Sequence, residues 1–304
     1  MNRNGIAQLV VLWALVLLGT LAMSFAFSMR TEAMASRNGL ETSRAYFQAR
    51  TGVERALALL SSGAVDNVLG GAIAGGEEGA TYEVHVSPEN GRVDINHVSE
   101  EALKEILRNC GLPEEEAERL GDAFLDWRDE DDRTRPAGAE EQEYRSLPEP
   151  LKPRNGRFAS VSELRHVRGV TPEFYERYLA VVFTVDSGMP GVNLNVAPIE
   201  VLRVLPGFTP ELAALAVARR VEAPFRSSSD VAAFLAAAGG GPSSIPVMST
   251  AATFPVYTIA SVGKAENAVT RAIRCTVEVR GGQSPFRVRR WEDQVPIYEE
   301  EEEE

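Results

Sequence analysis

The sequence has few of the residues on which enzyme active sites and metal centres most often depend. Its 304 residues include two cysteines, Cys110 and Cys275, and three histidines, His85, His97 and His166. The cysteines form no metal-binding spacing, and no nucleophile motif, phosphate loop or zinc spacing accompanies the histidines. These absences argue against an enzyme. For the cysteines two interpretations stay open: a disulfide between them, or small apolar residues, with Cys110 packed at a helix end.

Positive charge is also scarce. The formal net charge is −13, which argues against broad nucleic-acid binding because phosphate backbones are bound by an excess of Lys and Arg. Part of the negative charge lies in the run Glu299 to Glu304, which predicts a solvated, disordered tail. Hydrophobic residues make up 44% of the chain, enough for a packed core beside a membrane anchor.

A long apolar stretch lies near the N-terminus. The uncharged run from Ile6 to Met29 would make a helix of about 36 Å, enough to cross a bilayer. A secretory signal has a shorter apolar core, of about 7–15 residues, with the cleavage site after it. Here a hydrophilic leader ends at Gly5, before the apolar run. This arrangement resembles a type IV prepilin-like leader, with Ile6 as the first mature residue; a plain N-terminal anchor is the alternative.

Beyond the anchor, an amphipathic pattern continues the helix as far as residues 61–63, where Ser-Ser-Gly predicts its end. Helical spacing predicts a buried face made of Ala49, Val53, Ala56, Leu57 and Leu60. We therefore expect one long rod, with its lower half in lipid and its upper half against a globular domain.

Short strands are predicted on both sides of a helical block. Alternation of apolar and polar residues predicts strands at 82–86, 92–95, 257–262 and 272–279. The first two are expected to form a hairpin, after a Gly-rich loop at 70–79. Residues 96–250 are mostly helical in pattern, so we expect the early and late strands to pair beside an inserted helical block, an α+β arrangement.

The helical block contains an internal repeat. Three apolar segments end at Gly111, Gly169 and Gly207, and a new helix follows each of them at once. Thr171 and Thr209 suit the N-cap positions. Asp94-Ile95-Asn96 and Asn193-Leu194-Asn195 begin two of these units alike. Each unit is predicted to be a helix–hairpin–helix.

An acidic cluster lies in the first part of this block. Its members are Asp126, Asp129, Asp131, Asp132 and Glu140. Oxygen ligands in loops suit Ca²⁺, although an EF-hand is excluded because Thr134 occupies the position of its glycine. The alternative is a solvated acidic loop neutralised by Arg128, Arg133 and Arg135.

Taken together, these features resemble the minor pseudopilin K family of type II secretion systems over nearly the whole chain. The motifs that carry the resemblance are Gly5-Ile6, Leu9 to Arg30, Ala49 to Ala56, Asp126 to Asp132, Gly138-Ala139-Glu140, Gly156-Arg157-Phe158 and Ser162-Glu163-Leu164. None of these motifs is specific alone, but the ordered set is specific.

The resemblance implies an α+β fold. It would combine a type IV pilin-like long N-terminal helix and a small antiparallel sheet with a large all-α insertion that contains helix–hairpin–helix, SAM-like units. The expected segments are a prepilin leader at 1–5, a transmembrane helix at 6–29, the periplasmic part of the helix at 30–62, pilin-like strands at 63–95, helical subdomains at 96–185 and 186–250, further strands at 251–282 and an acidic tail at 283–304.

The resemblance also implies a place in the cell and a set of partners. The protein would lie in the inner membrane as a single-pass protein, with its globular part in the periplasm, at the tip of a short pseudopilus beside minor pseudopilins I and J. Further implied partners are the prepilin peptidase and the inner-membrane assembly platform, with a secreted substrate or the secretin as additional candidates. No nucleic acid is expected. The K family resemblance implies calcium in the helical domain, which favours the metal interpretation of the acidic cluster.

One departure from the general pilin pattern fits a tip subunit. Most mature pilins carry Glu at their fifth residue, and here that position is Val10. Such a Glu would pair within the membrane with the amino terminus of a neighbouring subunit, since an isolated intramembrane charge is costly. A tip subunit has no subunit above it to pair with.

A DNA receptor is the best alternative function. Residues 193–208 resemble the helix–hairpin–helix of membrane-anchored competence DNA receptors, but Thr209 replaces the second glycine of the usual Gly-Ile-Gly hairpin. Arg203, Arg219 and Arg220 keep this alternative open.

Overall fold

The computed structural model describes residues 3–62, 71–77, 79–146, 150–241, 243–248, 256–280 and 285–293, with only the backbone described for 3–8 and 267. The chain forms two compact units. The first unit comprises Met1–Val86, Ile259–Cys275 and Val288–Glu304, and the second comprises Ser87–Thr258 and Thr276–Arg287.

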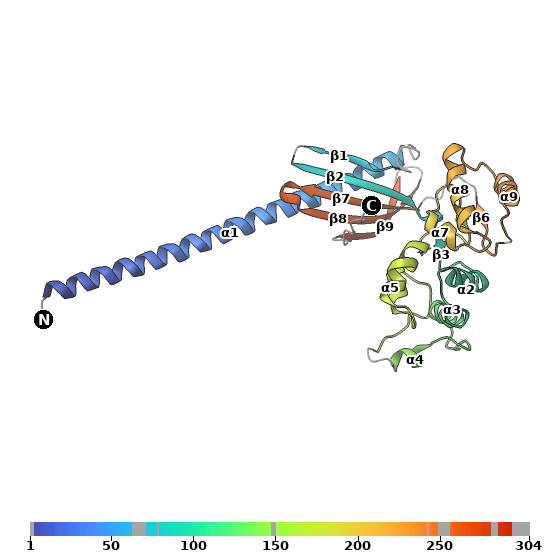
Figure 1. Cartoon of the computed structure of the whole chain (residues 1–304), viewed down its shortest axis with the longest axis horizontal. Helices are drawn as coiled ribbons and strands as arrows, with labels where there is room; N and C mark the ends of the chain where they lie inside the picture. Colours follow the sequence, from blue (N-terminus) through green and yellow to red (C-terminus); the bar gives the residue numbers. More distant parts are fainter. Residues whose placement is uncertain are drawn as a thin grey trace. The chain divides into compact units, whose positions relative to one another are not determined.

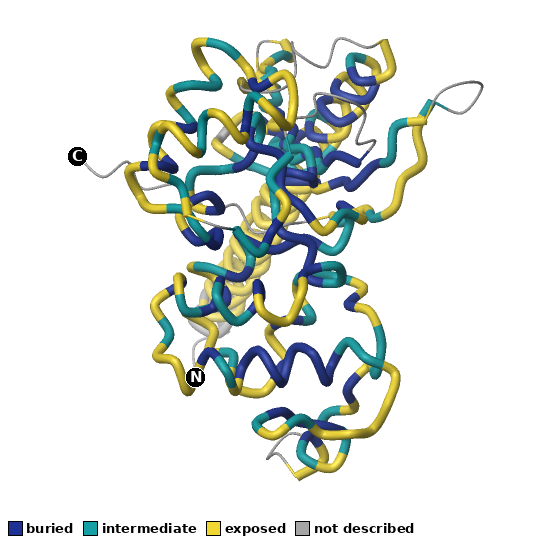
Figure 2. Tube along the Cα trace, turned by 90° about the vertical axis from the view of Figure 1, so that its right-hand side faces the viewer, coloured by how far each residue is buried: buried dark blue, intermediate teal, exposed yellow. Residues whose placement is uncertain are grey.

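The first unit is built on one helix and a sheet. The helix α1 runs from Arg3 to Ser61 without a break, which confirms the predicted rod. The sheet has the order β1-β2-β7-β8-β9 (Figure 1). Its strands are β1 (Ile73–Glu77), β2 (Ala80–Pro88), β7 (Val256–Ala265), β8 (Thr270–Val279) and β9 (Phe286–Asp293). Residues 9–40 of α1 are exposed (Figure 2).

Small residues let α1 and the sheet approach to backbone contact. The predicted apolar face of the helix is buried, with Ala49, Val53 and Ala56 fully covered. A Cβ atom at Gly263 of β7 would lie 1.9 Å from the carbonyl oxygen of Ala45, so this position tolerates only glycine at the present spacing.

The predicted hairpin between 82–86 and 92–95 is wrong. β2 instead pairs antiparallel with β1, which lies in the Gly-rich stretch expected to be a loop. Gly76 and Gly79 adopt positive φ angles of 117° and 88°, so they allow the tight turn that this pairing needs. After β2, a 3₁₀ turn at Glu89–Gly91 leads into β3 (Val93–Asp94), which pairs in parallel with β4 (Phe183–Thr184).

The second unit is mainly helical. Its helices are α2 (Glu100–Asn109), α3 (Glu114–Arg128), α4 (Glu141–Arg145), α5 (Pro172–Phe174), a π-helical turn (Tyr175–Leu179), α6 (Ala180–Val182), α7 (Ile199–Val204), α8 (Pro210–Glu222) and α9 (Ser228–Ala237). The expectation of an all-α insertion needs correction, because β5 (Val192–Asn193) and β6 (Val247–Met248) form a second parallel pair like β3 and β4.

The predicted helix boundaries are confirmed at several turns. Gly111, Gly169 and Gly207 all have positive φ angles, between 77° and 95°. Thr171 and Thr209 each accept a hydrogen bond from the backbone N–H three residues later, as N-caps do. The segment before Gly169 differs from the expected α-helix, because Val161–His166 is a 3₁₀ helix.

The second unit contains the same local structure twice. The side chain of Asn96 makes two hydrogen bonds to the backbone of Phe158, of 3.0 and 2.8 Å. Asn195 makes the same two bonds to Phe225, of 2.9 and 2.8 Å. The likeness between 94–96 and 193–195 therefore marks a repeated structural unit.

A partly buried arginine closes each repeat. Arg128, at the end of α3, donates to the carbonyl oxygens of Ile95 and Val98. Arg220, near the end of α8, donates in the same way to Leu194 and Ala197. In the second repeat only residues 221–224 separate this arginine from Phe225. In the first repeat residues 129–157, which we call the inserted segment, lie between Arg128 and Phe158.

Candidate functional site

The inserted segment carries four of the five predicted acidic ligands, and the fifth, Asp126, faces it from α3. Asp126 is fully buried, and its carboxylate accepts hydrogen bonds from the backbone N–H and the guanidinium of Arg135. The same guanidinium nitrogen of Arg135 lies 2.6 Å from Asp126 Oδ1 and 2.6 Å from Asp129 Oδ2. Burial raises the pKa of Asp126, and Arg135 opposes that shift.

Close packing holds the inserted segment against α3. A Cβ atom at Gly138 would lie 1.9 Å from Asp126 Oδ2, so only glycine fits there. The backbone N–H of Ala137 donates to Asp122 of α3 at 3.2 Å. On the other side, Trp127 and Tyr144 pack edge to face with their centroids 5.2 Å apart. The segment therefore has a defined position next to α3.

Several buried oxygen atoms of this region lack a hydrogen-bond partner within the described structure. They are Oδ1 of Asp129, the side-chain oxygen of Asn155 and both carboxylate oxygens of Glu140. The Glu140 side chain faces the backbone N–H of Glu143 at the start of α4 without making a regular hydrogen bond to it. Glu140 is only 4% exposed. Leaving a buried carboxylate unpaired costs free energy, and such groups are normally paired or bound to a metal ion. These atoms make the region a candidate site for a cation.

The remaining predicted ligands, Asp131 and Asp132, are exposed on the inserted segment. Asp131 accepts a hydrogen bond from the backbone N–H of Arg133, and Asp132 accepts one from the side chain of Asn155 at 2.9 Å. Asn155 was missed by the sequence analysis. Its positive φ of 47° and the glycine that follows it are a turn signal that places its side chain opposite Asp132.

The competing interpretation is an acidic loop neutralised by Arg128, Arg133 and Arg135. Only one of these three arginines pairs its side chain with carboxylates of the cluster in the described structure. Arg135 pairs with two carboxylates, but the guanidinium of Arg128 binds carbonyl oxygens, and Arg133 uses its backbone N–H. In the described part of the chain, no three His, Cys, Asp or Glu side chains are gathered as a preformed metal cage. Oxygen donors of this kind are the type that a hard cation such as Ca²⁺ prefers.

Glu140 gives this region a pH signature in the absence of metal. Burial first, and then the charges of Asp126 and Asp129, raise the pKa of Glu140 from 4.5 to about 7. Because the folded state binds this proton more tightly than the unfolded chain, the stabilisation is complete below pH 4.5 and is lost as the pH rises to about 7. In chelator, Glu140→Gln should remove a fall of about 1–3 kcal/mol in the unfolding free energy between pH 5 and 7.

Urea unfolding at a series of pH values measures this effect. Glu130→Gln is the matched control, because Glu130 is exposed on the same segment. If Glu140→Gln and the control gave parallel pH profiles, the raised pKa of Glu140 would be contradicted.

Other predicted features lie elsewhere in the structure. Both cysteines are free and buried, and burial raises the pKa of the Cys110 thiol to about 12. Val10 is 63% exposed on α1, and Gly5 and Ile6 lie in the helical backbone of α1 with their side chains outside the described set. Within the described chain, α1 is long and apolar enough to cross a membrane from Leu9 onward.

Two of the three arginines that favoured the DNA-receptor alternative make hydrogen bonds within their own repeat. Arg220 is committed to two carbonyl oxygens of its own repeat. Arg219 donates to the carbonyl oxygen of Ala223 and lies 3.6 Å from Asp230. Only Arg203 is exposed, so this hairpin presents little positive charge to a phosphate backbone.

Comparison with known proteins finds sequence similarity to one family. Residues 80–187 match the family model described as type II secretion system (T2SS), protein K. The type II secretion system protein K of Pectobacterium carotovorum subsp. carotovorum is 34% identical over 90 residues, which cover 30% of this chain and 27% of that protein. The protein of the same name from Dickeya chrysanthemi is 31% identical over 115 residues, covering 38% of this chain and 29% of its own length. The chain thus spans less than a third of the length of these relatives.

A solved structure extends the likeness to most of the chain. A chain in the crystal structure of the GspK-GspI-GspJ complex from the enterotoxigenic Escherichia coli type 2 secretion system matches with a TM-score of 0.67 at 15% identity. The match covers 86% of this chain and 100% of that chain. At this identity the match shows the shared fold. The family model, the relatives and the shared fold confirm that this chain resembles protein K of type II secretion systems.

Proposed function

We propose that the chain is a minor pseudopilin of a type II secretion system. In this role it forms the tip of the periplasmic pseudopilus with minor pseudopilins I and J, and it supports export of folded proteins across the outer membrane. The observation that carries the proposal is the combination, in one chain, of a 59-residue N-terminal helix, a five-stranded sheet and a helical unit. The same fold occurs in a protein that is crystallised with I- and J-type partners.

Two features support a tip position. Val10 stands where a pilin helix would carry the glutamate that pairs with its neighbour, so this helix lacks the charge that would join it to a subunit above. The helical unit also adds a bulky body to the pilin-like part, and such a body would collide with its copies if it repeated along a tightly wound fibre. A capping subunit avoids both difficulties.

The membrane position rests on α1. Its N-terminal part exposes large apolar side chains such as Leu9, Trp13 and Phe25, which a bilayer or other helices would cover. We place this part in the inner membrane and the globular part in the periplasm, next to the assembly platform. Gly19 and Ala22 offer small surfaces for close helix packing in lipid.

The proposed maturation step gives a direct prediction. Prepilin peptidase is expected to cleave between Gly5 and Ile6, because the hydrophilic leader ends there and the apolar helix must stay on the mature chain. Gly5→Leu should abolish cleavage, and Asn4→Leu is the matched control. N-terminal sequencing from cells with and without the peptidase measures it. A mature chain that starts beyond residue 20 would overturn both the cleavage site and the pseudopilin assignment.

We also propose that the inserted segment binds Ca²⁺. Of the five predicted ligands, Asp129, Asp131, Asp132 and Glu140 would supply carboxylates, and Asn155 would add a side-chain carbonyl oxygen. We assign the fifth, Asp126, a different part from the predicted one, because its carboxylate pairs with Arg135. A bound Ca²⁺ supplies the positive charge that these buried oxygens lack. This chain's own contribution is to hold the segment against α3 through Gly138, Ala137 and Tyr144.

The two repeats are best described as helix–hairpin–helix, SAM-like units used for protein assembly. Their glycine turns and N-caps have the required local geometry, but the arginines of the second repeat serve its own fold. A DNA receptor would need several exposed cations around the hairpin. Salt-dependent DNA binding by the full chain would favour that alternative over the tip role.

A further inference from the structure

We propose that the cavity between α3 and the inserted segment is a peptide-binding site. Its ligand is an extended peptide that carries a carboxylate beside an apolar side chain. The cavity has a volume of about 610 Å³ and is distinct from the proposed Ca²⁺ ligands. The inference does not require the tip position, since it depends only on groups inside the second unit.

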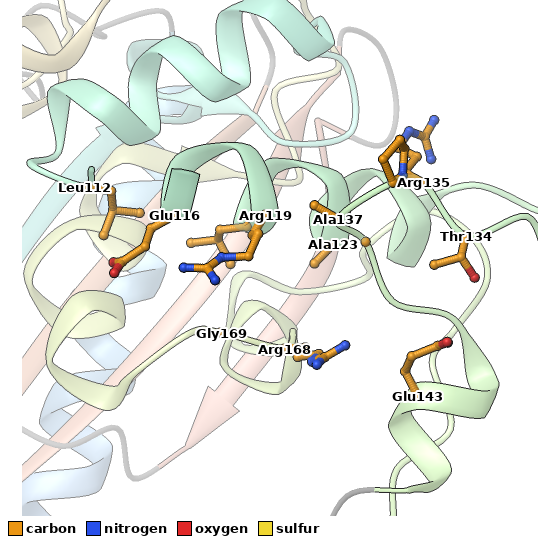
Figure 3. A pocket seen from close by; sticks show the side chains of 13 residues that line it. Leu112, Glu116, Arg119, Ala123, Thr134, Arg135, Ala137, Glu143, Arg168 and Gly169 are labelled. Carbon is orange, nitrogen blue, oxygen red and sulfur yellow. The ribbon is translucent and has the colours of Figure 1, made fainter. Parts of the chain in front are cut away.

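The cavity is lined by a few apolar residues and by several charged side chains (Figure 3). On the α3 side, Leu112 is partly exposed and Leu120 and Ala123 are almost fully covered, and Thr134 to Gly138 form the facing wall. Gly169 bounds a third side, where its positive φ of 95° turns the backbone. An apolar side chain of the ligand would lie between Leu112 on one side and Pro136 and Ala137 on the other.

The wall exists because the inserted segment is held in place. Ala137 is tied to Asp122, and Arg135 is tied to Asp126, so residues 134–138 cross α3 at a fixed distance. Both bonds lie within the second unit, so its own residues hold the wall of the cavity in place. A wall held by such bonds lowers the entropy lost on binding, since less of the site has to be ordered.

The second repeat shows what the inserted segment adds. The closing arginines Arg128 and Arg220 align α3 with α8, which matches Ala123 with Leu215. Ala123 is 2% exposed beneath the inserted segment, whereas Leu215 is 52% exposed on bare α8. The repeated unit therefore folds without any such wall, and the wall of the cavity belongs to the insertion and not to the repeat.

The cavity is lined by charged side chains that could bind the carboxylate and the N–H groups of a peptide. Figure 3 shows Arg119 and Arg168 beside the cavity, and neither guanidinium makes a hydrogen bond or ion pair with a described residue. A free guanidinium binds a carboxylate well, because its N–H groups match the two oxygens. Glu116 and Glu143 also line the cavity. These carboxylates would repel a simple polyanion but can accept hydrogen bonds from peptide N–H groups.

The carboxylate could come from two sources, a chain terminus or an Asp or Glu side chain. Three fluorescein-labelled glycine-serine peptides separate them: one ends in leucine with a free carboxylate, one ends in leucine amide, and one has an internal Leu-Glu pair and an amidated end. Fluorescence polarisation with the full chain in nanodiscs, with Ca²⁺ present, measures their affinity. We expect saturable binding of at least one of the two acidic peptides, and at least tenfold weaker binding of the leucine amide.

Variants test whether the binding uses this cavity. Arg119→Gln with Arg168→Gln should weaken binding at least tenfold, and Arg203→Gln, an exposed arginine on α7, should leave it unchanged. Because Arg119 and Arg168 are exposed, the fold should survive, which a melting curve checks. The proposal is overturned if no acidic peptide binds saturably, if the amide binds equally well, or if the double variant binds like the parent chain. A positive result with the free-acid peptide alone identifies a chain terminus, and one with the internal Leu-Glu peptide identifies a side chain.

Discussion

Calcium ions are expected to raise the melting temperature of the second unit by roughly 5–10 °C when present at about 100 times their dissociation constant. A ligand that binds only the folded state adds about 2.7 kcal/mol at that excess. For a unit of this size each kcal/mol corresponds to about 2–4 °C. The physical reason is that Ca²⁺ would neutralise the buried oxygens of Glu140 and Asp129, which otherwise have no partner.

Paired substitutions test the source of this shift. Asp131→Ala with Asp132→Ala should abolish the shift, because it removes two of the proposed carboxylate ligands. Both residues are exposed, so the melting temperature without Ca²⁺ should change little. Glu200→Ala with Glu222→Ala removes the same charge from the second repeat and should leave the shift intact. Calorimetry of the full chain in Ca²⁺ and in chelator measures both variants. Identical melting curves in the two buffers would return the cluster to an acidic loop neutralised by Arg135.

The second large effect is expected at the contact between α1 and the sheet. Gly263→Val should destabilise the first unit by about 3 kcal/mol or more, since its Cβ would overlap the carbonyl oxygen of Ala45. Neither partner can yield, because that oxygen belongs to the backbone of a continuous helix. Gly71→Val is the control, as a Cβ there meets nothing within 4 Å.

Hydrogen exchange localises this prediction. The amides of β7 and β8 should exchange much faster in Gly263→Val, while those of α3 and α8 in the second unit should keep their protection. Equal protection of β7 in the variant and in the parent chain would show that the helix and sheet are less tightly packed than the structure indicates.

Local sequence signals predicted the helical parts of this fold well. The spacing of Ala49, Val53 and Ala56 determines which face of α1 is buried, and the glycines at 111 and 207 determine where helices end. These features depend on residues within one or two turns of each other. Periodicity and capping describe such short-range effects directly.

Strand pairing was harder to predict because it depends on distant segments. The pattern around 87–91 favours a hairpin, yet β3 pairs with β4, far along the chain. Glu89 explains part of the outcome, because its buried carboxylate accepts a hydrogen bond from Thr184 of β4. The strand β9 lies in a region assigned to the acidic tail, since charged residues break its alternation.

The candidate metal region was predicted in outline only. Clustering of carboxylates is visible in the sequence, but the burial of Asp126 within α3 and its pairing with Arg135 depend on how the inserted segment folds back. The hydrogen bond from Asn155 to Asp132 was missed for the same reason, because the two residues lie far apart in sequence. The inserted segment becomes recognisable only in the structure, where Arg128 and Arg220 donate hydrogen bonds to equivalent carbonyl oxygens of the two repeats.

Co-expression of the full chain with I- and J-type minor pseudopilins from the same system tests the central proposal most directly. Purified from detergent-solubilised membranes, the three proteins should elute as one complex with a single copy of this chain. Without its partners, this chain should form no filament. A homopolymer of this chain, or failure to bind either partner together with salt-dependent DNA binding, would contradict the tip assignment.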